Sequence, residues 1–483
     1  MAYETVIGLE VHVELNTKTK LFCGCENRFA AEPNSLACPV CLGLPGLLPV
    51  VNKRAVEKHI MAAIALGCEI LEYSKFDRKN YYYPDMPKNY QISQYDLPIA
   101  IKGCLEIEKS DGTKKVIGIT RIHLEEDTGK SIHGGGSGSI MESDYTLLDY
   151  NRAGVPLMEI VSEPDMRSPE EAYLYLTGLK KILNWIGVSD CKMEQGSLRC
   201  DANISLRKKG ELEFGVKTEI KNMNSFKSVR SALEFEEKRQ AEVLENGGKI
   251  SQETRGWEED KGITVSMRSK EDAHDYRYFP EPDLAPLKIS REWVDEIGKD
   301  LPELPDDRRE RFIREYRLPE YDAGVLTTSR EMSDFLEEAV VVCNDPKQVS
   351  NWLMSDISKY LNEKQVEIQE TKLSASTLGG MINMIKKGTI SGKIGKKLIA
   401  ELLNKGGDPE EIVKKKGWIQ VSSEEELLPL VKEAIDANPK AVEEYLGGKK
   451  SAIGFFVGQV MKATGGKANP GVVNKILMRE LEK

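Results

Sequence analysis

Hydrophobic and polar residues alternate without a break from residue 9 to residue 15, where the sequence reads Leu-Glu-Val-His-Val-Glu-Leu. Because side chains alternate across a β-strand, this run predicts a strand with four apolar residues on one face and Glu10, His12 and Glu14 on the other. The apolar face can pack on a core. The polar face can be solvated or can hold a metal ion, and this run alone leaves both interpretations open.

Two later runs repeat the pattern. Alternation from residue 199 to residue 206 places Asp201 on a polar face, and alternation from residue 121 to residue 127 does the same for Glu125. Glu159 lies inside the apolar run of residues 155–161, where an unpaired carboxylate would be costly to bury. Glu159 therefore needs a partner, and a metal ion would serve.

Few helical patterns interrupt these strands. Helices are predicted at residues 53–66, 168–186 and 224–245, the second of which begins with a capping serine, a first-turn proline and two acids. The pattern predicts an α+β fold with a mostly antiparallel domain over residues 1–289, ending at a proline-rich linker near residues 279–283. Only helices are expected beyond it, in a helical domain (290–371) and a small all-α tail domain (372–483) with several Gly-Gly pairs.

Composition excludes some classes of protein. No apolar run approaches the roughly 18 residues of a membrane span, and no basic segment followed by an apolar one opens the chain, so we expect neither a membrane protein nor a secreted one. Nine cysteines, four of them clustered, fit a reducing compartment with a metal site better than a disulfide framework, which places the protein in the cytoplasm.

The net charge of −10 is unevenly distributed. Residues 372–483 hold 19 basic and 13 acidic residues, a net charge of +6, which leaves −16 for the rest. An acidic body with a mildly basic tail suits a metal-binding catalytic domain joined to a part that contacts nucleic acid. A helical domain solvated by lysines explains the charge equally well.

The cysteines follow the pattern CxC, twelve residues, CxxC. Short turns can bring each pair round one ion, and four thiolates leave no open position for water, which is typical of structural zinc. The sequence thus predicts a zinc site formed by Cys23, Cys25, Cys38 and Cys41. The alternative is four buried thiols that behave as small apolar residues.

The polar strand faces could together form a second site. Carboxylates with one imidazole on a common face would suit Mg²⁺ or Mn²⁺ in phosphate chemistry, although sequence alone does not show that these strands are neighbours, and surface carboxylates are the alternative. No GxxxxGK[ST] loop and no GxGxxG after a strand is present, so ATP would have to bind in another way. The aromatic and basic stretch of residues 79–95 suits either a nucleotide or tRNA-end pocket or an ordered connection.

Several long strings resemble one family, the B subunits of the tRNA-dependent amidotransferase. The strings that carry this resemblance lie at residues 7–12, 83–95, 149–157, 199–203 and 275–283. The resemblance implies an ATP-dependent carbon–nitrogen ligase with glutamine as amido donor. The chain would phosphorylate the side-chain carboxylate of Glu-tRNA(Gln) or Asp-tRNA(Asn), and ammonia from the amidase partner (the A subunit), arriving through a tunnel, would displace the phosphate. A small C subunit would hold the two together, and the tail domain would contact the tRNA elbow.

By matching positions, the resemblance also implies functional residues. It implies that Mg²⁺ or Mn²⁺ is bound by Glu10, His12, Glu125, Glu159 and Asp201. Glu10, His12 and Glu125 would be catalytic, together with Lys79 and Lys88, which would contact phosphate or line the ammonia path; His123 is left as a bystander. Neither the ATP contacts nor the native tRNA can be identified in this way. The alternatives are a non-catalytic RNA-binding zinc protein and a kinase or ligase of free amino acids.

Overall fold

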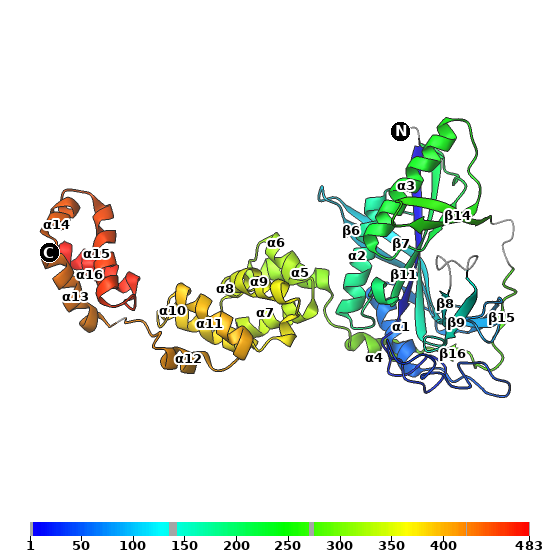
Figure 1. Cartoon of the computed structure of the whole chain (residues 1–483), viewed down its shortest axis with the longest axis horizontal. Helices are drawn as coiled ribbons and strands as arrows, with labels where there is room; N and C mark the ends of the chain where they lie inside the picture. Colours follow the sequence, from blue (N-terminus) through cyan, green and yellow to red (C-terminus); the bar gives the residue numbers. More distant parts are fainter. Residues whose placement is uncertain (1–2, 135–142, 270–274, 422, 483) are drawn as a thin grey trace. The chain divides into compact units, whose positions relative to one another are not determined.

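A computed structural model describes residues 3–134, 143–269, 275–421 and 423–482. The chain forms two compact units, Met1–Leu304 and Pro305–Lys483, called here the first and the second unit. The first unit is built on a large sheet and the second unit is helical, which confirms the α+β prediction (Figure 1). Among the described residues, no helix is both long and apolar enough to cross a membrane.

The large sheet of the first unit has nine strands. All its strand pairs are antiparallel except β12–β13, which is parallel. In spatial order the strands are β14 (Ile263–Ser269), β13 (Glu253–Glu258), β12 (Thr218–Lys221), β11 (Leu198–Lys208), β1 (Tyr3–Glu14), β10 (Pro156–Ser162), β7 (Lys114–Glu126), β6 (Ala100–Glu108) and β2 (Glu69–Ile70).

Smaller sheets complete the first unit. They consist of β15 (Phe279–Pro280), β4 (Asp77–Asn80) and β5 (Tyr90–Ser93); of β16 (Leu287–Lys288) and β3 (Tyr73–Ser74); and of β8 (Lys130–Gly134) and β9 (Tyr145–Asp149). Its helices are α1 (Lys53–Ala65), α2 (Pro169–Trp185), α3 (Phe226–Glu245) and α4 (Arg291–Lys299), with a short 3₁₀ turn, η1 (Met193–Gln195).

The apolar face of the large sheet lies under the helices. Leu9, Val11 and Val13 of β1 are completely buried, and they share one core with residues of α1, α2 and α3. Figure 1 shows α2 and α3 against one face of the sheet. The alternation of β1 therefore has the predicted effect, because burying its apolar positions leaves Glu10, His12 and Glu14 together on the opposite face.

One expectation about the connections is wrong, and the structure shows the order of a stretch for which the sequence left two interpretations open. The predicted linker near residues 279–283 is part of the first unit, because Phe279 and Pro280 pair with β4 and Glu281 is buried in an ion pair with Arg78. The stretch of residues 79–95 includes the end of β4 and all of β5. These two strands pair with each other, so the stretch is ordered although its sequence shows little strand periodicity. The prolines suggested a linker because proline cannot donate a backbone hydrogen bond to a neighbouring strand, but an edge strand tolerates it.

The second unit holds two separate apolar cores. The first core is formed by α5 (Pro305–Tyr316), α6 (Glu320–Leu326), α7 (Arg330–Cys343), α8 (Pro346–Trp352), η3 (Leu353–Ile357), α9 (Ser358–Lys364), η4 (Ile368–Glu370), α10 (Ala375–Lys386), α11 (Gly392–Lys405) and α12 (Pro409–Lys416). The second is formed by α13 (Glu424–Asp436), α14 (Pro439–Leu446), η5 (Lys450–Ala452), α15 (Ile453–Ala463) and α16 (Pro470–Leu481).

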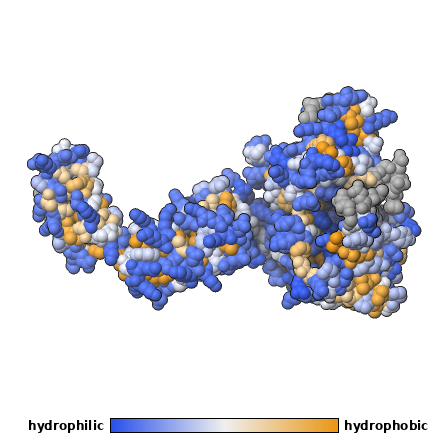
Figure 2. Space-filling view, in the orientation of Figure 1, coloured by the Kyte–Doolittle hydropathy of each residue, from blue (hydrophilic) through white to orange (hydrophobic). Residues whose placement is uncertain are grey.

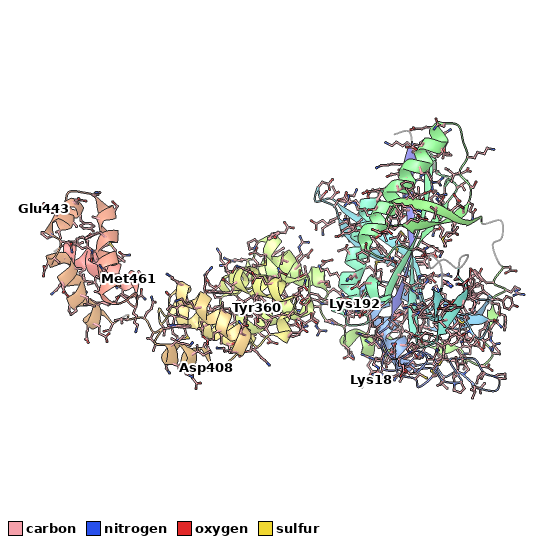
Figure 3. All side chains as sticks on the ribbon, in the orientation of Figure 1. Lys18, Lys192, Tyr360, Asp408, Glu443 and Met461 are labelled. Atoms are coloured by element: carbon pink, nitrogen blue, oxygen red, sulfur yellow. The ribbon has the colours of Figure 1, made fainter. Side chains whose placement is uncertain are left out.

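The first of these cores crosses the predicted boundary between residues 371 and 372. Leu336 of α7 and Leu378 of α10 are both completely buried in it. Asp408, which Figure 3 labels, caps α12 by accepting a hydrogen bond from the Glu411 amide. This helix also contributes to the same core. On the face drawn in Figure 2, hydrophilic residues cover most of each unit.

Candidate active site and metal centres

Strand register brings three of the predicted residues together on the polar face of the large sheet. His12 of β1 lies opposite Glu159 of β10, which lies opposite His123 of β7. Residues paired across neighbouring strands point to the same side, and Glu125, two residues beyond His123, shares that side. Three strands that are far apart in sequence thus present one row of imidazoles and carboxylates.

The row is close enough to bind an ion. The Nε2 atom of His12 lies 3.3 Å from a carboxylate oxygen of Glu159 and 3.9 Å from one of Glu125. One ligand atom each from His12, Glu125 and Glu159 can be chosen so that all lie within 4.8 Å of one another. Two carboxylates and an imidazole are ligands that a divalent cation accepts while keeping positions for water or phosphate oxygens.

Charges in the row are strongly coupled. Burial would raise the pKa of Glu159, but the charges of His123 and His12 and their hydrogen bonds hold it well below its usual range. Burial would likewise lower the pKa of His123, yet Glu159 and Glu125 raise it to about 9. The carboxylates thus favour a cation between them, which is the condition a metal site requires.

His123 is a functional candidate that the sequence analysis set aside. Its Nε2 lies 3.2 Å from Glu159 and 3.7 Å from Glu125, so its side chain lies within the row. Its Nδ1 atom is buried, and no described atom bonds to it. The signal that could have found it is the alternation of residues 121–127, which places His123 on the same face as Glu125.

Glu10 and Asp201 lie on the same face but outside the group of ligand atoms described above. They face each other across β1 and β11, and the Asn203 amide donates to Glu10 at 2.9 Å. Lys221 forms an ion pair with Asp201 and a second, of 3.3 Å, with Glu219. Burial raises the pKa of Glu10, and the charges of Glu159 and Asp201 raise it further.

Beside Glu10 the sheet is hollowed by a cavity of about 310 Å³. Glu10 and Asn203 line it together with Phe214 and Lys217, which come from the segment between β11 and β12. Its position next to the His12 row brings an aromatic ring, a cation and an amide close to the candidate metal ligands.

The two predicted lysines lie in different surroundings. Lys79 of β4 holds its Nζ 4.9 Å from the centre of the Tyr276 ring. Burial would lower the pKa of Lys79, but the charge of Glu125 and, less strongly, that of Glu159 raise it. Lys88 instead forms an ion pair with Glu126, away from Glu125, and lines a second cavity of about 180 Å³.

The cysteine segment follows β1 and begins near Lys18, which Figure 3 labels. The sulfur atoms of Cys23, Cys25, Cys38 and Cys41 all lie within 4.8 Å of one another. Turns bring them there: the Leu42 amide donates to the Cys38 carbonyl, and the Cys38 amide donates to the Cys41 sulfur at 3.0 Å. Four soft sulfur donors fit zinc, and the shared hydrogen bond with Cys23 lowers the pKa of Cys41 to about 4.

Comparisons with known proteins agree on one family. Residues 5–295 match the family model described as "GatB/GatE catalytic domain", and residues 334–481 match the one described as "GatB domain". A relative from Carboxydothermus hydrogenoformans is 58% identical over 481 residues, which cover all of this chain and 99% of the relative. Relatives from Thermoanaerobacter sp. (strain X514) and Halalkalibacterium halodurans are 56% and 58% identical over 483 residues, with both chains covered completely. All three are named as B subunits of the aspartyl/glutamyl-tRNA(Asn/Gln) amidotransferase.

Proposed function

The chain belongs to the GatB/GatE family of tRNA-dependent amidotransferase B subunits, and we propose that the polar face of its large sheet phosphorylates the side-chain carboxylate of tRNA-bound glutamate or aspartate. The observation that carries the proposal is the row of His12, Glu125 and Glu159 beside the cavity that Glu10 lines. The row offers ligands for a cation, and the cavity offers room for part of a nucleotide.

The reaction needs ATP because a carboxylate is a poor electrophile. A carboxylate oxygen attacks the γ-phosphorus of ATP, the bond to the bridging oxygen breaks, and ADP leaves with that electron pair. Ammonia then attacks the acyl phosphate, phosphate departs, and a proton from nitrogen is released as the amide forms. The carboxylate and the nucleotide repel each other, so the site must supply positive charge during the first step.

The residues of this chain divide that work. His12, Glu125 and Glu159 would hold Mg²⁺ or Mn²⁺, which when bound would offset the charge of the phosphates. Lys79 would support the same task, since the charge of Glu125 raises the pKa of its ammonium group. Glu10 lies one alternation before His12 on β1, and Asp201 faces Glu10 from β11, where both would orient ligands or waters around the phosphates. This division keeps all five predicted metal residues on one face but gives them different roles.

We place the nucleotide in the cavity beside Glu10. Phe214 can stack on a base, and Lys217 can approach a phosphate. Val6, Gly8 and Ser205, from the paired strands β1 and β11, also line the cavity. Such a site needs no glycine-rich phosphate loop, which agrees with the absence of one from the sequence.

Partners follow from the chemistry. The amidase partner, the A subunit, would supply ammonia from glutamine, and a small C subunit would support the assembly. Lys88 and Glu126 line the cavity of about 180 Å³ together with Cys23 and Cys41, which makes this cavity a candidate section of the ammonia path. Zinc bound by the four cysteines would then be structural, holding one wall of that cavity in place.

Labelled phosphate tests the proposal. The complete amidotransferase, given ATP labelled at the γ-phosphate, should transfer label to Glu-tRNA(Gln) or Asp-tRNA(Asn) and none to free glutamate or aspartate. Label on a free amino acid would instead favour a free amino-acid kinase. Absence of any transfer with intact tRNA binding would favour the non-catalytic RNA-binding alternative, which the match to a catalytic domain does not support.

A further inference from the structure

Lys20 is a completely buried lysine, with none of its surface exposed. Its Nζ lies 3.6 Å from the Cys41 sulfur and 3.3 Å from the Tyr150 carbonyl oxygen. In the described part of the chain, no carboxylate lies within ion-pair distance of this Nζ. Among the described residues, the Cys41 sulfur is therefore the one group able to carry a negative charge that Lys20 contacts.

A buried ammonium group without a countercharge is expensive. Moving such an ion out of water remains unfavourable even after the protein relaxes around it, and one neutral carbonyl offsets little of that cost. A zinc ion with four thiolates carries a net charge of −2, because four negative sulfurs exceed the charge of the metal by two. The cysteine cluster would thus provide the charge that Lys20 needs.

The backbone fixes Lys20 against this cluster from both sides. The Lys20 amide donates to the Cys25 carbonyl at 3.0 Å, and the next amide, of Leu21, donates to the Gly154 carbonyl at 2.8 Å. Gly154 has a φ of +85°, and a Cβ built on it would lie 3.5 Å from both the Lys20 Cδ and the Cys41 Cβ. The lysine side chain therefore runs in a slot between the cysteine segment and the segment that leads into β10.

We propose that Lys20 is the internal counter-ion of the tetrathiolate metal site, and that through the Tyr150 carbonyl it fixes the site to the segment preceding β10. The proposal rests on the zinc binding proposed above. Lys20 is a positioning residue: its charge stabilises the metal-bound thiolates, and its second hydrogen bond joins the loop to Tyr150, in the segment between β9 and β10. Partners of this kind around metal ligands typically contribute about 10–100-fold in metal affinity.

Zinc release tests the proposal. The complete amidotransferase is purified with wild-type chain, Lys20→Met, Lys20→Gln or Lys20→Arg, its zinc content is measured by mass spectrometry, and loss of zinc to a coloured chelator is followed. Lys58→Met is the matched control, because Lys58 is also a buried lysine but bonds to Asn16 and the Gly187 carbonyl. We expect release about 10–100-fold faster in both neutral variants, and near the wild-type rate in Lys20→Arg and Lys58→Met.

The outcomes separate the two proposals. A wild-type protein that holds no metal on its cysteines overturns zinc binding itself. Full zinc content with unchanged release in Lys20→Met and Lys20→Gln overturns the counter-ion role alone. If a neutral variant does not fold, the pair Lys20→Arg and Lys58→Met decides: zinc retained at the wild-type rate by Lys20→Arg supports the role of the charge, and release at least 10-fold faster from Lys20→Arg than from Lys58→Met contradicts it.

Discussion

At the scale of single residues, burial decides which polar side chains need a partner. Glu159 is 8% exposed within an apolar run, and the structure supplies the partners that its burial requires in His12 and His123. The sequence indicated the need for a partner but not its identity, because the partners come from two other strands. Alternation could have placed His123 on the right face, whereas only register shows that it meets Glu159.

Replacing His123 should weaken cation binding. His123→Phe keeps the volume of the ring but removes an imidazole that contacts Glu159 and Glu125. We expect Mn²⁺ affinity, measured by electron paramagnetic resonance of free Mn²⁺, to fall about 10–100-fold. His133→Phe, a histidine of β8, is the control, and equal affinities for the two variants would remove His123 from the site.

The ion pair of Arg78 and Glu281 should hold the edge of a small sheet. Arg78 donates from Nε and from a terminal nitrogen to the two oxygens of Glu281, at 2.6 and 2.8 Å. Because Arg78→Met leaves a buried carboxylate without its cation, we expect a loss of about 3–5 kcal/mol in local stability, seen as faster hydrogen exchange over β4 and β15. Exchange should return towards wild type when Glu281→Met is added, and failure to do so would contradict this assignment.

At the scale of elements, local signals predicted the helices well. Residues 168–186 carried a serine cap, an early proline and two acids, and α2 occupies Pro169–Trp185 with the Ser168 hydroxyl accepting from the Glu171 amide. β1 was likewise readable from its alternation. Strand order was not readable, because the nine-strand sheet joins β1 to β10 and β11 through contacts more than a hundred residues apart.

The start of α2 should make stability depend on pH. Burial would raise the pKa of Glu171, but hydrogen bonds from Lys115, the Arg167 amide and Lys109 hold it below the usual 4.5. A lowered folded pKa means that the unfolded chain binds the proton first, so this stabilisation is complete above pH 4.5 and is lost as the pH falls through the folded value.

Glu171→Gln should therefore reduce the amount of folding stability that the chain loses as the pH falls. The urea midpoint of the first unit, followed by fluorescence at about pH 7 and about pH 4, should fall less on acidification in Glu171→Gln than in the wild-type chain. Identical falls would show that other carboxylates dominate. Glu170→Gln, one residue earlier in the same turn, provides the control for removing a first-turn charge.

At the scale of the whole molecule, the structure narrows the part of the chain that carries the excess positive charge. The sequence placed a net +6 in residues 372–483, and the cores divide this region between α12 and α13. Residues 372–422 hold 10 basic and 4 acidic residues, whereas residues 423–483 hold 9 of each. The excess positive charge is thus carried by the region of α10 to α12. These helices share an apolar core with α7.

This distribution predicts which lysines bind tRNA. Replacing Lys387, Lys393 and Lys397, all exposed, with alanine should weaken tRNA binding and lower the salt slope of the binding constant by roughly 0.7–0.9 for each phosphate that is no longer neutralised. The matched control replaces Lys432, Lys440 and Lys475, which are exposed on or beside α13 to α16. Equal decreases in affinity for both triple variants, measured by filter binding across salt concentrations, would contradict the prediction.

Phosphoryl transfer on the polar face of the large sheet, as proposed here, can be measured directly. Glu10 and His12 lie on that face at neighbouring polar positions of β1, with the cavity on one side and the Glu159 carboxylate on the other. The direct measurement is transfer of the labelled γ-phosphate of ATP to Glu-tRNA(Gln) by the complete amidotransferase that carries Glu10→Ala and His12→Ala. We predict a rate lower by about 10²–10³-fold, with glutamine hydrolysis by the partner and tRNA binding retained. An unchanged rate of transfer would contradict the account.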